Sequence, residues 1–381
     1  MSNSCVVILD PRGIITKGGQ DVILRHATYA QYLSKNVSSD KLSLVIISTG
    51  RDRKSVYSNN NLSVERISKP TFNSIIFAKK AASVVKSKNL DVKLLVAGDP
   101  WESFWSAYFF NMFCSKKVPI QIQLHGDIAN PTWKRISIQN RIRFNLAKFS
   151  MSKASGIRAV SNSQAVNVSK IFKIKKAQIS VIPVPINNLR LTSSIYSKKP
   201  KTLGLIGRIH NDRGIYNFIK LVKLLTVVRD DFTVVIAGGG PEESRFLEEI
   251  KELLPKSKIR FLGHLPEKEL KKVWREVGVL VSTAPAESYG RVMREALVAG
   301  VPVWAMKSSG VEDLISKAGK DAVKILDLTK GNHDLSKELD QLLKSKVSLS
   351  FRNQFIKDNS TYAQLLAKSW VDLINEQKKI I

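Results

Sequence analysis

The stretch "TVVIAGGGPEESRFLEEIKELL", residues 233–254, contains one complete strand–loop–helix unit. It begins with an apolar, β-branched run of strand length and ends in a segment with helical periodicity over 242–254. Pro241 suits the first helical turn, and the glycines from Gly238 to Gly240 let backbone amides approach a ligand closely. A short buried strand followed at once by a helix is the building unit of parallel α/β proteins.

The same unit recurs along the chain, in two successive series. Apolar runs of strand length are "CVVIL" (5–9), "LSLVIIS" (42–48), "VKLLVAG" (92–98), "PIQIQLHG" (119–126), "IRAVS" (157–161), "TLGLIG" (202–207), "FTVVIAGGG" (232–240), "IRFLG" (259–263), "VLVST" (279–283) and "VPVWA" (301–305). Helical periodicity occupies segments between them, among others 20–35, 72–88, 213–227, 242–254 and 266–276. Two such series predict an α/β protein with two Rossmann-like domains.

The length supports that division, because 381 residues exceed one comfortable core and indicate two domains of about 150–200 residues. The segment 183–201 is rich in Pro, Asn, Ser and Lys and is the natural join. We therefore expect a first domain over 1–190 and a second over 191–360. Residues 361–381 should form an amphipathic C-terminal helix.

Composition argues against several classes of protein. The start of the chain lacks the pattern of a secretory signal, and no run of 18 apolar residues predicts a membrane span. Cys5 and Cys114 are the only cysteines and have no metal-ligand spacing, which suits a reducing compartment. We expect a cytoplasmic protein.

The net charge of +29 is concentrated in the first half of the chain. Residues 1–190 carry 29 Lys and Arg against 9 Asp and Glu, and residues 128–190 contain no acidic residue. This asymmetry predicts an anionic partner for the first half, such as phosphate, an acidic lipid surface or nucleic acid.

Three loops that follow strands of the second half carry reactive or ligand-binding groups. "LIGRIHNDRG" contains Arg208 and Arg213, "IAGGGPEES" contains the glycine run, and "STAPAESYG" contains Glu287. In open α/β sheets ligands bind beyond the carboxyl ends of the strands, where these loops should meet. Taken singly, a glycine run can be only a tight turn, two loop arginines can be solvated, and a first-turn Glu can serve the helix dipole.

The stretch "ESYGRVMREALVAGVPV", residues 287–303, predicts a helix from about Gly290 to residue 299 that Gly300 caps. Glu287 then lies at the helix N-terminus and Glu295 in the second turn, leaning back toward the same opening. Free helix amides favour an anion, and a carboxylate can accept hydrogen bonds from neighbouring hydroxyls. The pair therefore suits a ligand with phosphates and diols, such as a nucleotide-sugar.

These residues carry a family resemblance. The two glutamates eight apart followed by "EALVAGVPV" resemble the signature of retaining glycosyltransferases of the GT-B fold, family GT4, and "GLIGRIHNDRG", "VVIAGGGP" and "FLGHLPEKELKKVW" resemble other second-domain motifs. In the first half "ITKGGQDVILRHATYAQYL", "IQLHGD", "AVSNSQA" and "IPVPI" resemble the family's glycine loop and later strands. The resemblance implies two domains facing a central cleft, with the C-terminal helix crossing back to the first.

The resemblance also implies a role for individual residues on the donor side. Arg208 and Arg213 would neutralise the donor diphosphate, Glu295 would bind the ribose hydroxyls, and Glu287 would contact the donor sugar. Arg213 departs from the family's usual Lys but keeps the charge in a planar form, so we expect function to be retained. The remaining donor-binding residues would be Gly239, Ser288, Tyr289 and Gly290.

In the first domain the resemblance implies that Gly18 and Gly19 close on the donor phosphate and the acceptor. His125 would approach the transferred sugar, which makes it a catalytic candidate together with Glu287. A single His at a strand end is more often a buried hydrogen-bonding residue than a catalytic one. The turn that Gly126 and Asp127 predict after it favours the catalytic interpretation.

The expected reaction is metal-independent sugar transfer with retention of configuration and no cofactor, from a nucleoside-diphosphate sugar to a hydroxyl acceptor. No Asp-x-Asp and no metal-ligand spacing occur, so Arg208, Arg213 and a helix N-terminus would hold the leaving diphosphate. A glycoside hydrolase would not explain the arginine pair and the glycine loop. A nucleotide-sugar epimerase, a soluble enzyme with a small sugar acceptor and, less favoured, a nucleic-acid-binding protein remain alternatives.

The acceptor is expected to be a glycan, in particular a lipid-linked or cell-surface precursor. The segments 130–153 and 72–88 mix apolar and aromatic residues with many cations, as helices do that lie on anionic membranes. Ordinary core-facing helices with a solvated basic face would show the same composition. We expect peripheral association with the cytoplasmic face of a membrane and no nucleic-acid partner.

Overall fold

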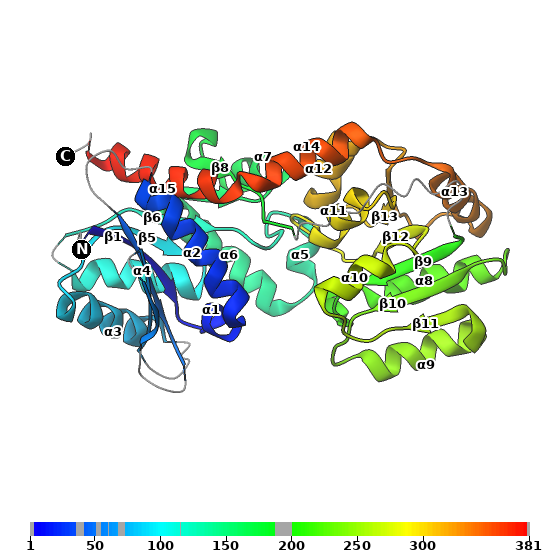
Figure 1. The fold of residues 1–381 in the computed structure, drawn as a ribbon, viewed down its shortest axis with the longest axis horizontal. Helices are drawn as coiled ribbons and strands as arrows, with labels where there is room; N and C mark the ends of the chain where they lie inside the picture. The colour runs from blue at the N-terminus through cyan, green and yellow to red at the C-terminus, as the bar shows by residue number, and fades with distance from the viewer. Residues whose placement is uncertain are drawn as a thin grey trace. The chain divides into compact units, whose positions relative to one another are not determined.

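The computed structural model describes residues 4–35, 42–50, 55–59, 61–67, 73–114, 116–186 and 200–378, and the chain divides into two compact units (Figure 1). Unit 1 comprises Met1–Ala129, Ser137–Pro183 and Thr361–Ile381, and unit 2 comprises Asn130–Ile136 and Val184–Ser360. Most of the predicted join, 187–199, lies outside the described residues.

Unit 1 contains an eight-stranded sheet in the order β3-β4-β2-β1-β5-β6-β7-β8. Its strands are β1 (Ser4–Asp10), β2 (Ser43–Ser48), β3 (Ser55–Ser58), β4 (Leu62–Arg66), β5 (Asp91–Ala97), β6 (Ile120–Gln123), β7 (Gly156–Ala159) and β8 (Ile179–Val181). Every pairing is parallel except that of β3 with β4. The central strands are continuous apolar runs because both of their faces are buried.

Helices cover that sheet, and the last of them comes from the end of the chain. They are α1 (Ile14–Lys17), α2 (Gly19–Lys35), α3 (Ser74–Ser87), α4 (Glu102–Phe113), α6 (Ile138–Lys153), α7 (Asn162–Phe172), the 3-10 turn η1 (Lys176–Gln178) and α15 (Tyr362–Lys378). α15 packs along α2, with Trp370 fully buried between them and the sheet. The indole Nε1 of Trp370 donates a hydrogen bond to the buried Gln121 of β6 at 2.8 Å.

Unit 2 contains a fully parallel six-stranded sheet in the order β11-β10-β9-β12-β13-β14. Its strands are β9 (Thr202–Ile206), β10 (Thr233–Ala237), β11 (Ile259–Phe261), β12 (Val279–Ser282), β13 (Val303–Ala305) and β14 (Val323–Ile325). Its helical segments are α5 (Pro131–Arg135), η2 (Asn211–Arg213), α8 (Ile215–Thr226), α9 (Glu243–Leu253), η3 (Lys256–Lys258), α10 (Glu267–Val273), α11 (Arg291–Val298), α12 (Ser309–Ala318), α13 (Asn332–Lys344) and α14 (Leu349–Ser360).

Both faces of the second sheet are covered by apolar helix faces. Phe218 of α8 and Phe246 of α9 pack on one face, and Trp274, after α10, and Met293 of α11 pack on the other. Each fully buried side chain of this size stabilises the fold by about 1.5–3 kcal/mol relative to an exposed one. The prediction of an α/β protein with two Rossmann-like, parallel-sheet domains is confirmed.

One prediction for the first half needs correction. The run "IPVPI" (182–186) contains no strand: β8 ends at Val181, because Pro183 and Pro185 have no N–H to give to a sheet ladder.

The basic segment 130–153 forms two helices, α5 and α6. They are divided at Ser137, whose side chain accepts a hydrogen bond from the Asn140 amide and caps α6.

Candidate functional site

Three loops of unit 2 leave the carboxyl ends of neighbouring strands. The loops follow β10, β9 and β12, which stand side by side in that order, so their contents meet at one edge of the sheet. This arrangement is the one that the sequence predicted for the arginine loop, the glycine loop and the loop of Glu287.

The glycine loop and the arginine loop lie directly against each other. A Cβ at Gly238 would lie 1.8 Å from the Gly207 carbonyl oxygen, and one at Gly240 would lie 2.2 Å from that of Ile209. The Ile209 amide also donates to the Gly239 carbonyl at 3.0 Å. Only residues without side chains allow this approach, which explains the glycine run and leaves exposed backbone at the strand ends.

The arginine loop is equally close to the loop that follows β12. A Cβ at Gly214, whose φ is +68°, would lie 1.9 Å from the Thr283 carbonyl oxygen. The Thr283 hydroxyl donates to the carbonyl of Arg213 at 3.4 Å. Backbone contacts of this kind fix the position of Arg213 relative to the 283–290 loop.

Glu287 joins these loops through its carboxylate. Its Oε2 accepts a hydrogen bond from Arg213 Nη1 at 2.9 Å, and its Oε1 accepts from the amides of Gly290 at 3.0 Å and Tyr289 at 3.3 Å. Gly290 is the N-cap of α11 in the left-handed conformation, with φ of +71°. The carboxylate thus occupies the N-terminal end of α11, where the helix dipole favours negative charge.

Asp212, which the sequence analysis did not single out, holds the other arginine. Arg208 Nη2 donates to Asp212 Oδ2 at 3.1 Å, and Arg213 Nε lies 3.9 Å from Oδ1 of the same residue. The imidazole of His210 lies 2.8 Å from that carboxylate. The side chain of Arg208 is 62% exposed and that of Arg213 is 43% exposed, so both guanidinium groups reach solvent.

Glu295 lies in the second turn of α11, as predicted, but it is almost completely buried at 5% exposure. Arg291, one turn earlier, extends over it with Nη2 at 3.6 Å from the carboxylate. Ser288 and Tyr289 are also buried. A ligand could reach the Glu295 carboxylate only if the half-exposed Arg291 side chain moved.

Arg294, a buried cation that contacts the 283–290 loop, was missed by the sequence analysis. Arg294 is fully buried, donates to Asp313 Oδ2 at 2.6 Å and lies 3.7 Å from the centre of the Tyr289 ring. Burial lowers the pKa of the guanidinium, while Tyr289, Asp313 and Glu287 oppose that shift. Its Nε and Nη1 have no hydrogen-bond partner. A single Arg between Met293 and Glu295 in sequence gives no signal of such burial.

In unit 1 the predicted site residues follow β1 and β6, which flank β5 in the sheet. Gly18 ends α1 and Gly19 begins α2. The Asp10 carboxylate positions this loop by accepting hydrogen bonds from the amides of Ile14 and Ile15 at 2.9 and 2.8 Å.

His125 comes two residues after β6 and is exposed rather than buried in the core. The loop around it is fixed, because the Leu124 amide donates to the Arg158 carbonyl at 2.9 Å and Gln164 Nε2 donates to the Gly126 carbonyl at 2.8 Å. Although the side chain reaches solvent, the neighbouring protein atoms and the charges of Arg158 and Arg25 lower the pKa of His125.

Two features are absent from the residues that the structure describes. No group of three His, Cys, Asp or Glu side chains there could hold a metal ion. Across the same residues no helix has both the length and the apolar character needed to cross a bilayer.

A family model matches the part of the chain that carries this sheet edge. Residues 192–361 match the family model "Glycosyl transferases group 1". The 2-deoxystreptamine glucosyltransferase of Streptomyces kanamyceticus is 23% identical over 192 residues, which are 47% of this chain and 50% of that protein. The chain thus spans about half the length of this curated relative.

Solved structures resemble the whole chain. The lipopolysaccharide outer core galactosyltransferase WaaB superposes with a TM-score of 0.66 at 14% identity, over 98% of this chain and 99% of its own. HepE of Anabaena, solved with UDP and glucose, gives 0.59 at 17% identity, over 99% of this chain and 98% of its own. These neighbours are GT-B glycosyltransferases, so the predicted fold class is confirmed.

Proposed function

We propose that this chain is a retaining, metal-independent glycosyltransferase that moves a sugar from a nucleoside-diphosphate sugar to a hydroxyl acceptor. The observation that carries the proposal is the junction of three loops at one sheet edge, where Arg213 and Glu287 meet at 2.9 Å. The match to glycosyl transferases group 1 covers the residues of that junction.

The diphosphate would bind against Arg208, Arg213 and the bare backbone at Gly239. In the structure both arginines pair with carboxylates, Arg208 with Asp212 and Arg213 with Glu287. A guanidinium carries five N–H donors, so each can keep one carboxylate contact while other donors turn to phosphate oxygens. These partners hold the cations in place before the ligand arrives.

The nucleoside would extend toward α11, with its ribose hydroxyls on Glu295. Because Arg291 forms an ion pair with that carboxylate, we infer that the ribose hydroxyls would displace Arg291 from Glu295. The transferred sugar would contact Glu287 and the backbone of Ser288, Tyr289 and Gly290.

Catalysis would consist mainly of stabilising the departing diphosphate. As the bond to the sugar loosens, negative charge grows on the leaving oxygen, and the guanidinium groups of Arg208 and Arg213 would stabilise that charge. Removing one such donor from an enzyme typically costs about 2.7–4 kcal/mol of transition-state stabilisation. The roles of His125, Gly18 and Gly19 stay predictions: His125 would approach the transferred sugar, and the two glycines would close on the donor phosphate and the acceptor.

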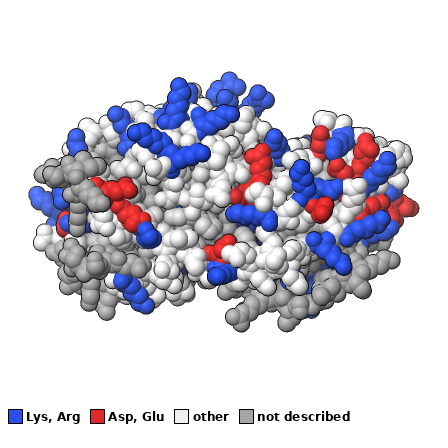
Figure 2. All heavy atoms as spheres, turned by 90° about the horizontal axis from the view of Figure 1, so that it is seen from above, with Lys and Arg blue, Asp and Glu red and all other residues white. Residues whose placement is uncertain are grey.

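We also propose a lipid-linked acceptor, reached from an anionic membrane surface. One stripe of α6, spaced as one helical face, exposes Ile138, Ile142, Leu146 and Phe149, at 76%, 56%, 41% and 38%. Lys148 and Lys153 of the same helix lie over aromatic rings, Phe144 at 5.3 Å and Phe149 at 5.9 Å. Figure 2 shows basic side chains gathered along the upper part of the face drawn, whereas basic and acidic side chains alternate toward its right-hand end.

The comparisons leave a second acceptor class open. WaaB is named for lipopolysaccharide, whereas the Streptomyces relative is named for the small molecule 2-deoxystreptamine. The exposed apolar stripe of α6 favours the lipid class, because a soluble acceptor gives no reason to leave Ile138 and Ile142 more than half exposed.

The donor site is tested by thermal shift with UDP, GDP, ADP and their glucose conjugates in EDTA. One diphosphate family should raise the melting temperature of the parent, and Glu295→Gln should abolish most of that shift. Glu248→Gln, on the exposed face of α9, is the matched control and should respond as the parent does. A full shift in Glu295→Gln would remove the ribose assignment, and the absence of any nucleotide shift would remove the donor site.

A further inference from the structure

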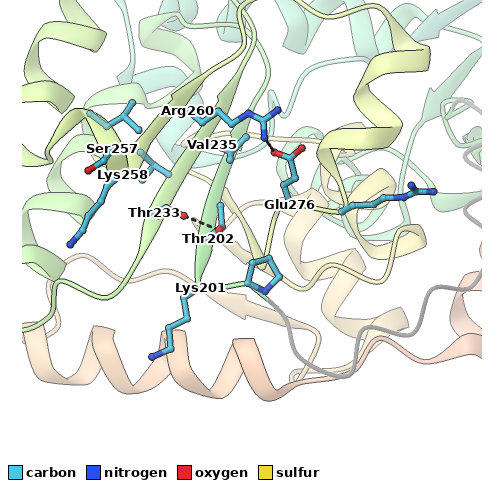
Figure 3. A pocket seen from close by; sticks show the side chains of 12 residues that line it. Lys201, Thr202, Thr233, Val235, Ser257, Lys258, Arg260 and Glu276 are labelled. Carbon is cyan, nitrogen blue, oxygen red and sulfur yellow. Dashed lines mark hydrogen bonds and ion pairs between the residues drawn. The ribbon is translucent and has the colours of Figure 1, made fainter.

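A charged side chain of unit 2 lies fully buried beside the loops of the proposed donor site. Arg294 of α11 is 0% exposed and belongs to the largest side chains of the core. The opposite edge of the sheet differs: it carries a pocket of about 770 Å³ at the amino ends of β9, β10 and β11, and every charged side chain that lines this pocket is exposed or half-buried (Figure 3). Burying a guanidinium costs free energy, so the burial of Arg294 needs a physical reason.

The ion pair that Arg294 forms does not supply this reason. Its Nη2 donates to Asp313 Oδ2 of α12 at 2.6 Å, but Lys317 Nζ lies 3.0 Å from the same oxygen. Asp313 would therefore keep a cation without Arg294. The Nε and Nη1 of Arg294 have no hydrogen-bond partner, which adds a cost that an apolar side chain of similar length would avoid.

The other close contact of Arg294 is with the ring of Tyr289. The guanidinium carbon lies over the ring, 3.7 Å from its centre. Tyr289 is only 4% exposed, so both partners are desolvated, and desolvation strengthens the attraction between a cation and an aromatic face. Arg294 therefore holds the Tyr289 ring in place.

The backbone of Tyr289 carries this constraint to Glu287. The amides of Tyr289 and Gly290 donate to Glu287 Oε1 at 3.3 and 3.0 Å. The amides that orient the carboxylate thus belong to the residue whose ring is held and to the residue after it. A change in the position of the ring would move these donors.

α12 holds the same loop through its backbone. The Gly310 amide donates to the Glu287 carbonyl at 2.7 Å, and a Cβ at Gly310 would lie 2.8 Å from that oxygen. Asp313, the partner of Arg294, lies about one turn further along this helix. A closed ring of contacts therefore runs from the loop to α12, from α12 to Arg294, and from Arg294 back to the loop.

We propose that Arg294 is a positioning residue: through Tyr289 it holds the 287–290 loop in the conformation that contacts the transferred sugar. The inference rests on the proposed function, in which this loop meets the sugar while the arginine and glycine loops bind the diphosphate. The arginine loop is held by its own backbone contacts with Thr283. Loss of Arg294 should therefore weaken binding of the sugar part of the donor and spare the diphosphate part.

Calorimetric titration with UDP, GDP and ADP, and with the glucose conjugate of each, tests this assignment. At least one diphosphate and its conjugate should bind the parent. In Arg294→Met the Kd of that conjugate should rise roughly tenfold or more, while the Kd of its diphosphate stays within about twofold. Arg294→Lys restores a cation without the planar guanidinium and should recover part of the loss.

The matched control is Arg352→Met in α14. Arg352 is half-buried, and its Nε donates to the Val298 carbonyl at 2.7 Å, at the end of α11 that lies away from the loop. This change also removes a partly buried guanidinium from unit 2. Both Kd values should stay within about twofold of those of the parent.

Two results in Arg294→Met overturn the inference and leave the donor site standing. One is an unchanged Kd for the conjugate, and the other is an equal rise of both Kd values, which would mean that Arg294 serves only the stability of unit 2. If Arg294→Met does not fold, Tyr289→Leu removes the ring instead, and the same split between conjugate and diphosphate is required of it. A parent that binds none of the six ligands removes the donor site and this inference with it.

Discussion

The guanidinium of Arg213 donates a hydrogen bond to the Glu287 carboxylate in the structure, and it is proposed to bind the donor diphosphate as well. Arg213→Ala should lower kcat/KM roughly 10- to 150-fold. This corresponds to about 1.5–3 kcal/mol of lost transition-state stabilisation, because a charge-assisted hydrogen bond is lost. Arg213→Lys should recover most of this loss, since the charge is restored without the planar geometry.

The control for this change is Arg245→Ala, which removes an exposed guanidinium from α9. Initial rates over a range of donor concentrations measure the effect in each variant. Equal losses in Arg213→Ala and Arg245→Ala would show that net charge, rather than the Arg213 contact, is responsible.

His26 of α2 should make unit 1 sensitive to acid. Burial lowers the pKa of its imidazole from 6.5 to about 4, although the hydrogen bond to the Val22 carbonyl opposes that shift. His26 therefore binds a proton near pH 6.5 in the unfolded chain but only near pH 4 in the folded chain. The contribution of His26 to the free energy of unfolding is fully present above pH 6.5 and is lost as the pH falls from 6.5 to about 4.

Melting temperatures between pH 7 and pH 4 measure this effect. His26→Gln should flatten the decline, and His264→Gln, exposed in unit 2, should not. A decline in His26→Gln parallel to that of the parent would contradict the assignment. His125 changes stability in the same direction, so part of the slope should persist.

Single residues also show where sequence reasoning stops. Arg213 and Glu287 could be assigned to one place because each follows a strand, and the ends of parallel strands meet. Arg294 could not, because its burial depends on Tyr289, Asp313 and Phe355, which folding alone brings together. The cover of Arg291 over Glu295 was equally invisible, since an i, i+4 ion pair usually lies in solvent.

At the scale of elements, the predicted strands and helices with strong periodicity agree with the structure, and the misses are short or lie at an edge. The segment "IPVPI" has an apolar composition, but its prolines prevent a ladder, and the strand forms three residues earlier as β8. β3 and β14, of 4 and 3 residues, are edge strands that carry no pattern long enough to recognise.

The α6 helix should bind anionic vesicles through its exposed stripe. In vesicles of phosphatidylcholine with phosphatidylglycerol, the bound fraction should fall several-fold in Ile138→Ser/Ile142→Ser, because both side chains insert into the interface. Val166→Ser/Ile171→Ser removes two exposed apolar side chains from α7 and is the control. Sedimentation at low and moderate salt provides the measurement.

Salt separates the two contributions to vesicle binding. Attraction between Lys or Arg and anionic lipid weakens as the Debye length shrinks, whereas apolar insertion does not. Equal binding of both double variants would mean that charge alone attracts the protein. No sedimentation of the parent even at low salt would remove the membrane proposal.

At the scale of the whole molecule, the chain returns to its first unit after completing the second. α15 belongs to unit 1 by its contacts with α2 and by the buried Trp370, although it follows the last helix of unit 2 in sequence. The two-domain division could be expected from length and from the repeated strand–helix series. The amphipathic pattern of 361–381 predicted a helix, while the tryptophan contact with Gln121 depends on the assembled sheet.

Because units 1 and 2 have separate cores, we expect each unit to unfold in a transition of its own. A ligand of one unit and a core variant of the other should then shift the two melting temperatures independently. Trp370→Ala should destabilise unit 1 by about 3–5 kcal/mol, because it leaves a cavity and removes the indole donor from the buried Gln121 Oε1. UDP should raise only the transition of unit 2, since the arginines and glutamates proposed to bind it all belong to that unit. Calorimetry of the parent and of Trp370→Ala, each with and without UDP, measures both shifts. If Trp370→Ala lowered every transition equally, the two units would unfold as one cooperative structure, and the C-terminal helix would stabilise the molecule as a whole.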